Sequence, residues 1–96
     1  MGYAAKIVLQ LPISNQDLLA PFVEGCLRDG VALIAIAGEG CEEIEDLIDD
    51  LIVRDGSDKG RFLVTSSHAG ETIEEVMEFA SMFDAKGGQG VEVVKL

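Results

Sequence analysis

The sequence predicts a single α/β domain in which helices cover both faces of a four-stranded, mostly parallel sheet. Short apolar segments alternate with longer segments whose apolar residues recur every three or four positions, which indicates the order βαβαβαβ. One short segment, residues 31–37, is apolar throughout, as is typical of a strand buried on both faces. No repeat or linker divides residues 1–96, so we expect one three-layer domain. The alternation also implies right-handed crossovers between the parallel strands. We favour strand order 2-1-3-4, with 3-2-1-4 as the alternative.

The first half of the chain contains two predicted strands and one helix. A mostly apolar run rich in β-formers predicts the first strand over residues 4–11, and Pro12 ends it. Apolar residues at helical spacing predict a helix over residues 18–27. Gly30 suits the left-handed conformation in which many helices end. The second strand then follows over residues 31–37.

An amphipathic helix is expected over residues 41–52. Its apolar stripe begins at Cys41 and continues to Ile52. Its other face is strongly acidic, and the acids in the first turn suit the positive end of the helix dipole. We interpret this face as solvated, with the alternative that it docks a basic partner. The acidic residues are Glu42, Glu43, Glu45, Asp46, Asp49 and Asp50.

The last part of the chain predicts two strands with a helix between them. We expect the third strand over residues 62–65. The spacing of Thr72 and Glu75 is that of a capping box, which predicts the start of a helix over residues 73–83. The final strand is expected over residues 91–96, where two charges indicate a sheet edge. Polar, glycine-rich connections are expected at residues 55–60 and 86–90.

The charge balance excludes several classes of function. Eighteen acidic residues face seven basic ones, for a net charge of −11. This charge repels phosphates, so we predict neither a nucleic acid nor a membrane as partner. A signal peptide and a long apolar run are both lacking, and we expect a cytoplasmic protein. Cys26 and Cys41 are too few for a disulfide framework or a zinc cluster. We therefore expect free thiols, no metal site and no cofactor.

Candidate site residues gather where the strands are expected to end. Ligands bind beyond the carboxyl ends of parallel strands, and these ends share one rim. Cys41 begins a helix, a position that favours a thiolate, and His68 with Glu71 to orient its ring would complete a small catalytic site. The alternative is that neighbouring glutamates disfavour the thiolate and Cys41 is buried, while His68 helps the chain to turn. Three further rim residues are candidates for ligand contact: Asn15, Ser66 and Ser67.

No complete catalytic or phosphate-binding motif accompanies these residues. Gly38 and Gly40 have the spacing of a dinucleotide loop, but Glu43 stands where the third glycine is needed. The Gly-x-Ser-x-Gly elbow of serine hydrolases is also lacking, so Ser66 and Ser67 are more simply explained as backbone-bonding residues of a turn.

Two stretches combine glycine with cysteine and threonine with histidine and glutamates. The first has the pattern Gly-x-x-Cys and the second Thr-x-x-His-x-x-Glu-x-[Leu/Ile]-Glu-Glu. Together they resemble a family of small bacterial α/β domains of unknown function. The chain departs from that family at Ser67, where tryptophan is common, and at Ala69 and Gly70, where acids are common. The resemblance implies the fold and emphasises the histidine, without implying a reaction. The matching positions are Gly38, Cys41, Thr65, His68, Glu71, Ile73, Glu74 and Glu75.

Our leading hypothesis is a small cytoplasmic protein without catalysis that acts through protein contacts. The final strand offers an edge through which it could form a homodimer. The alternative is an enzyme or small-ligand-binding protein with a rim site at Cys41, His68 and Glu71. A second alternative is an acidic inhibitor, similar to an immunity protein, that binds a basic protein.

Overall fold

The computed structural model describes residues 2–53, 63–83 and 90–96. The predicted order βαβαβαβ is confirmed, although the first, second and fourth strands are shorter than predicted. The predicted turn at 55–60 and most of the predicted connection at 86–90 lie outside the described residues. The elements are β1 (Lys6–Gln10), a short 3₁₀ helix η1 (Gln16–Leu18), α1 (Leu19–Arg28), β2 (Leu33–Ala37), α2 (Cys41–Val53), β3 (Val64–His68), α3 (Ile73–Met82) and β4 (Val91–Val94).

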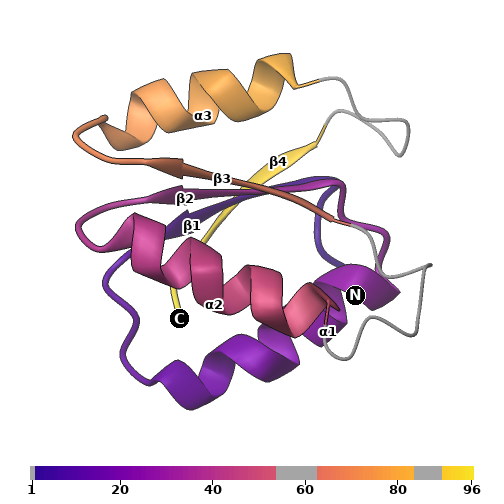
Figure 1. Ribbon diagram of the computed structural model, residues 1–96. Helices are drawn as coiled ribbons and strands as arrows, with labels where there is room; N and C mark the ends of the chain where they lie inside the picture. The colour runs from indigo at the N-terminus through magenta and orange to yellow at the C-terminus, as the bar shows by residue number, and fades with distance from the viewer. Residues whose placement is uncertain (1, 54–62, 84–89) are drawn as a thin grey trace.

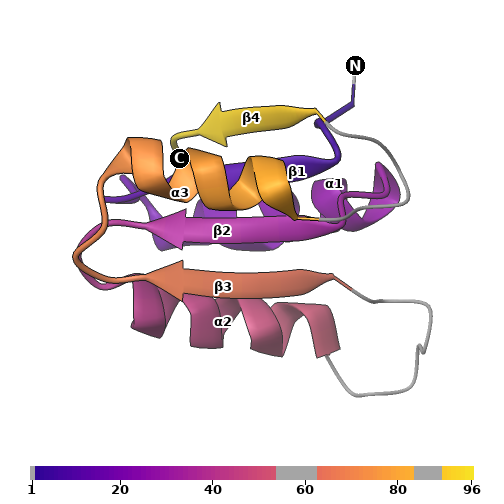
Figure 2. The same cartoon turned by 90° about the horizontal axis from the view of Figure 1, so that it is seen from above.

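The four strands form one sheet in the order β3-β2-β1-β4, and every neighbouring pair is parallel. The preferred order 2-1-3-4 was therefore wrong, and the alternative 3-2-1-4 is confirmed. The physical reason is burial: β1 and β2 are covered on both faces and take the central positions, whereas β3 and β4 are largely half-buried and take the edges. The edge position predicted for the last strand is correct (Figure 2).

This strand order decides which face each helix covers. The chain advances in one direction from β1 through β2 to β3, and then returns across the sheet to place β4 beside β1. Right-handed crossovers in opposite directions put their helices on opposite faces. Accordingly α1 and α2 lie on one face, here called the α1/α2 face, and α3 lies on the other, here called the α3 face (Figure 1).

Two hydrophobic cores lie on the two sides of the sheet. Alternation along β2 sends Ile34 and Ile36 into the core of the α1/α2 face, and Leu33 and Ala35 into the core of the α3 face. The first core is built of large aliphatic side chains and Phe22. The second contains mainly valine and alanine, which lets α3 approach the sheet closely.

Local interactions explain where the helices begin and end. Gly30 follows α1 with φ of 77°, as its predicted role in the left-handed cap requires. The capping box at the start of α3 is confirmed: the Glu75 N–H donates to Thr72 Oγ1 at 3.1 Å, and the Thr72 N–H donates to Glu75 Oε1 at 2.8 Å. Gly38 has φ of 120°, and a Cβ there would lie 2.9 Å from Leu11 Cβ, so only glycine fits between β2 and the end of β1.

The third strand begins and ends later than predicted. It was expected over residues 62–65, but it runs from Val64 to His68, so Ser66, Ser67 and His68 belong to the strand instead of the loop after it. Among the described residues, α3 packs mainly on β1 and β2, which leaves Ser66 half-buried on the α3 face of β3 (Figure 2). The backbone of β3 still pairs with β2, in a register that sets His68 opposite Ala37.

Within residues 2–53, 63–83 and 90–96, no helix combines the length and apolar character needed to cross a membrane.

Candidate functional site

His68 is the centre of a hydrogen-bonded chain at the carboxyl end of β3. Its ring Nε2 lies 2.8 Å from Ser66 Oγ, and its Nδ1 lies 3.1 Å from Glu71 Oε2. Ser66 and His68 are two residues apart in the strand, so both side chains stand on the α3 face. There the imidazole packs on the Phe79 ring at a centroid distance of 4.6 Å. The histidine is 6% exposed, so strand pairing, both hydrogen bonds and Phe79 together hold its ring in place.

The direction of these hydrogen bonds follows from the chemistry of the partners. The ionised carboxylate of Glu71 can only accept, so Nδ1 of His68 must carry a proton. In the neutral ring Nε2 is then an acceptor, and the Ser66 hydroxyl donates to it. The lone pairs of Ser66 Oγ therefore remain available on a half-buried side chain.

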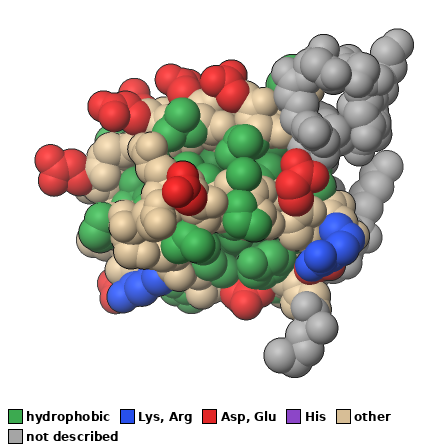
Figure 3. Space-filling view, turned by 90° about the horizontal axis from the view of Figure 1, so that it is seen from below, with side chains coloured by type: hydrophobic (Ala, Val, Ile, Leu, Met, Phe, Trp, Pro, Cys, Tyr) green, Lys and Arg blue, Asp and Glu red, His purple; other side chains and the backbone are tan. Residues whose placement is uncertain are grey.

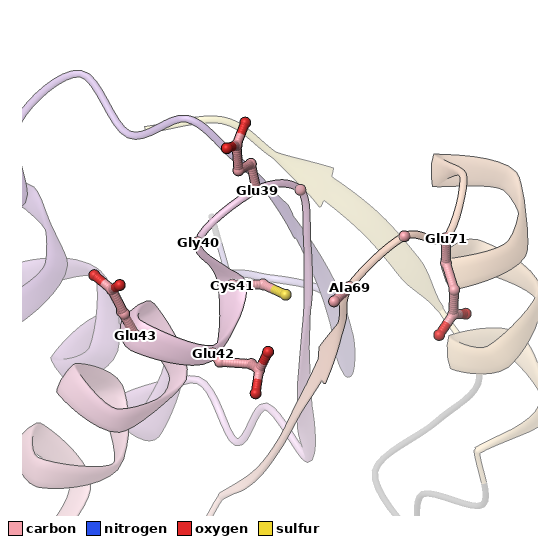
Figure 4. Close-up of a pocket in the computed structure, with 9 residues that line it drawn as sticks. Glu39, Gly40, Cys41, Glu42, Glu43, Ala69 and Glu71 are labelled. Carbon is pink, nitrogen blue, oxygen red and sulfur yellow. The ribbon is translucent and has the colours of Figure 1, made fainter.

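Cys41 does not join this chain. Its side chain is 1% exposed and belongs to the core of the α1/α2 face, whereas His68 packs against α3 on the other face. Figure 4 shows the sulfur directed towards Ala69, with Glu71 on the far side of that segment, beside α3. The structure thus unites two members of the predicted trio, His68 and Glu71, and separates the third from them by the backbone of β3.

Both cysteines are free thiols, as predicted. Cys26 is 0% exposed in the core of the α1/α2 face. Burial raises the pKa of the Cys26 thiol to about 12, and the negative charges of Asp29 and then Glu92 add to this effect. Cys26 is therefore a protonated, unreactive thiol at neutral pH.

The remaining predicted rim residues have separate roles. Asn15 Oδ1 accepts from the Asp17 N–H at 2.9 Å, which caps the short helix η1. Ser67 stands on the opposite face of β3 from Ser66 because side chains alternate along a strand. The sequence pattern does not distinguish Ser66 from Ser67, because it predicts a loop where the strand continues. Strand alternation was the signal that distinguishes them.

A hollow of about 590 Å³ lies at this rim, between the β2–α2 loop and the β3–α3 loop. Its lining includes four acidic residues, Glu39, Glu42, Glu43 and Glu71, and contains no basic residue, so anionic ligands are disfavoured there (Figure 4). In the described part of the chain, no group of three or more His, Cys, Asp or Glu side chains is placed to hold a metal ion.

A second hollow, of about 400 Å³, lies between the start of α1 and the middle of α2. We call it the α1–α2 groove. The space-filling view of this side shows apolar side chains gathered across the surface, with acidic groups around them (Figure 3). Leu47 in the groove and Leu18 beside it are 39% and 40% exposed. The groove is lined by Gln16, Asp17, Leu19, Ala20, Leu47, Asp50 and Leu51.

The groove is not among the sites predicted from the sequence, although the sequence contains a signal for it. The apolar stripe of α2 is wider than its contact with the sheet requires. Ile48 and Ile52 are buried in the core, whereas Leu47 and Leu51 lie to one side and line the groove. A stripe of this width indicates a second apolar contact surface.

The chain belongs to the family described as Domain of unknown function (DUF7684), whose model matches residues 3–95. The predicted membership of an uncharacterised domain family is correct at this level. Neither the curated proteins nor the solved structures include a match to the chain.

Proposed function

We propose that the protein is a binding module, which holds an amphipathic, basic helix of a partner protein in the α1–α2 groove. The observation that carries this proposal is an exposed apolar hollow with acidic residues in its own lining. The class of partner combines aliphatic anchors with flanking lysine or arginine residues.

The apolar part of the groove supports helix binding. Leu19, Leu47 and Leu51 line a channel between two helices. An amphipathic helix binds such a channel by inserting side chains spaced three or four residues apart. Burial of the exposed Leu47 side chain against the aliphatic side chains of the partner helix would supply the affinity for that helix.

The charged part of the groove supports a basic partner. Asp17 and Asp50 stand in the lining, and the acidic face of α2 continues beyond it. With a net charge of −11, the protein attracts cationic segments, which speeds association and orients the bound helix. Where the basic partner is an enzyme, binding of this kind would make the protein its inhibitor.

A second copy of the chain is a less suitable occupant of this groove. Two acidic rims would face each other, and like charges across an interface oppose association. Self-association would instead use the outer edge of β4, which has no strand beside it among the described residues. Substitutions in the groove would change the oligomeric state if two copies associated through the groove. They would leave it unchanged if two copies associated through the edge of β4.

The test is titration with two synthetic helical peptides that share leucine anchors and carry either lysine or glutamate at every other exposed position. Fluorescence anisotropy should detect binding of the lysine peptide only, with affinity falling as salt rises. Leu47→Ser should weaken binding about tenfold or more, about 1.4 kcal/mol. Val53→Ser is the matched control, since Val53 is 58% exposed on the same helix but does not line the groove.

Three results would contradict the proposal: equal binding of both peptides, no binding of either, or equal effects of the two substitutions. Analytical ultracentrifugation of the same variants covers self-association. A dimer that Leu47→Ser dissociates, together with no peptide binding, would replace the proposed partner with a second copy of the chain.

A further inference from the structure

We propose that Ser66, His68 and Glu71 form an acyl-transfer site on the α3 face of β3, which acts on short-chain esters that are neutral or cationic. Ser66 is the nucleophile and His68 the general base. Glu71 is a positioning residue that holds the imidazole and touches no substrate. This site lies on the opposite side of the sheet from the α1–α2 groove, and it stands independently of the function proposed above.

The proposal rests on the sequence of hydrogen bonds from the serine through the histidine to the glutamate. A serine nucleophile requires a base within hydrogen-bonding reach, and the base requires a third group that fixes its tautomer. Ser66 Oγ lies 2.8 Å from His68 Nε2, and Glu71 Oε2 lies 3.1 Å from Nδ1. Each of the two ring nitrogens therefore has the partner that such a relay needs.

The neighbouring hydroxyl groups show that this arrangement is specific to Ser66. Thr65 Oγ1 faces α2, where it lies 2.7 Å from Asp49 Oδ1 and 3.1 Å from Glu45 Oε2. Ser67 shares that side of the strand with Thr65. Of three consecutive hydroxyl residues, it is Ser66 whose oxygen is bonded to the imidazole.

Access and rigidity also favour this role. Among the described residues, α3 packs mainly on β1 and β2, so it covers His68 on the α3 face of β3 but leaves Ser66 half-buried (Figure 2). Ser66 is half-buried and reachable, whereas the His68 side chain is 7% exposed and is packed on Phe79. A nucleophile at the surface and a base held below it need little rearrangement when a substrate arrives.

The chemical step balances with an ester and water as the only co-reactants. Ser66 Oγ attacks the carbonyl carbon while its proton moves to His68 Nε2, and the carbonyl π electrons move to the carbonyl oxygen. Collapse of this intermediate breaks the bond to the leaving alkoxide, which takes the proton from Nε2. Water then attacks the acyl-serine by the same route, releasing the acid and restoring Ser66. Glu71 keeps the Nδ1 proton in place and stabilises the transient imidazolium.

The surroundings define the substrate class. Glu71 stands in the site, and Glu39 and Glu42 line the adjoining hollow, so anionic esters and phosphates are repelled. Phe79 is 40% exposed, and Val64 is partly buried on the same face as Ser66. These two side chains offer an apolar contact for a short acyl chain.

The first test uses an uncharged fluorophosphonate probe and p-nitrophenyl acetate with the full chain. Peptide mass spectrometry should place the adduct on Ser66, and Ser66→Ala should lower the rate about 100-fold or more. Ser67→Ala is the matched control, because it removes a neighbouring hydroxyl from the other face of the strand, and its rate should equal that of the wild type. An adduct at another residue, or equal rates in the two variants, would overturn the proposal.

The second test reads the position of the proton and does not depend on turnover. Long-range ¹H–¹⁵N correlation spectra should show His68 protonated at Nδ1, and Glu71→Gln should produce a mixture of tautomers with acylation slowed about tenfold. Glu74→Gln, which removes a nearby exposed carboxylate from the start of α3, should change neither readout. Protonation at Nε2 in the wild type would overturn the relay. Since no peptide is involved, failure here leaves the groove proposal standing, and the reverse is also true.

Discussion

The two faces of the sheet use different chemistry. The α1/α2 face is filled with large aliphatic side chains under two helices, and its core has no buried charged residue among those described. The α3 face has a smaller core of mainly valine and alanine under one helix, and it holds both buried polar residues of the described chain, Lys6 and His68. One face therefore contributes most of the hydrophobic stabilisation, and the other retains groups capable of chemistry.

The buried polar groups on the α3 face lie at opposite ends of α3. Lys6 Nζ donates to the Ser81 carbonyl at 3.3 Å, where the negative end of the helix dipole favours a cation. His68 and Glu71 lie at the other end, beside the capping box. The short α3 is thus anchored by polar contacts at both ends and by small apolar residues between them.

Truncation of a core side chain should have the largest effect on stability, and the effect should differ between the two faces. Ile36→Ala removes a fully buried side chain beneath α1 and α2 and should lower the free energy of unfolding by about 4 kcal/mol. Val76→Ala on the α3 face should cost about 2 kcal/mol, since fewer methyl groups leave a smaller cavity. Urea denaturation of both variants provides the measurement. If Val76→Ala lost more stability than Ile36→Ala, the α3 face and not the α1/α2 face would contribute most of the hydrophobic stabilisation.

Enlarging a small core residue should test how tightly the α3 face is packed. Ala35 is fully buried beneath α3, and Ala35→Leu should destabilise the protein by about 2 kcal/mol because the close helix must move. The same substitution at exposed Ala20 should change stability by less than about 0.5 kcal/mol. Urea midpoints would again be compared. If Ala35→Leu were neutral, α3 would not be as closely packed as its small residues indicate.

Sequence reasoning succeeded where one local signal determined the outcome. The apolar run ending at Ala37 indicated a strand buried on both faces, and Thr72 with Glu75 indicated the start of α3. Strand order was not determined locally, because it depends on which strands can be covered on both faces at once. The link between Ser66 and His68 required knowing that β3 continues through both residues, and the polar composition of that segment concealed it.

Removal of the helix cap should affect one end of the α3 face alone. Thr72→Ala deletes the side chain that accepts from the Glu75 N–H and should cost about 1 kcal/mol. Hydrogen exchange should then quicken in the first turn of α3 and remain unchanged in α1 and α2. The control is Thr72→Ser, which keeps the acceptor and should preserve most of the stability. Uniform acceleration of exchange in all three helices would show that the two faces unfold as one unit.

The smallest expected effect is the pH dependence of stability that arises from Asp29, at the end of α1. Asp29 Oδ2 accepts from the Tyr3 N–H at 3.0 Å, and Oδ1 accepts from Arg28 Nε at 3.2 Å. The Tyr3 bond first, and then the Arg28 side chain, lower the pKa of Asp29 below its ordinary value of 3.8. Because the folded-state pKa is depressed, the stabilisation is complete above the ordinary value and is lost as pH falls through the folded value.

Asp29→Asn should therefore lower the urea midpoint at neutral pH, and its difference from the wild type should shrink as the pH approaches the folded pKa of Asp29. Asp46→Asn, which neutralises an exposed carboxylate in the middle of α2, measures the effect of net charge alone. If relief of acidic self-repulsion dominated, both variants would be stabilised at neutral pH by similar amounts. A loss confined to Asp29→Asn would instead show that a specific charged hydrogen bond ties the N-terminal segment to the end of α1, beside the larger core.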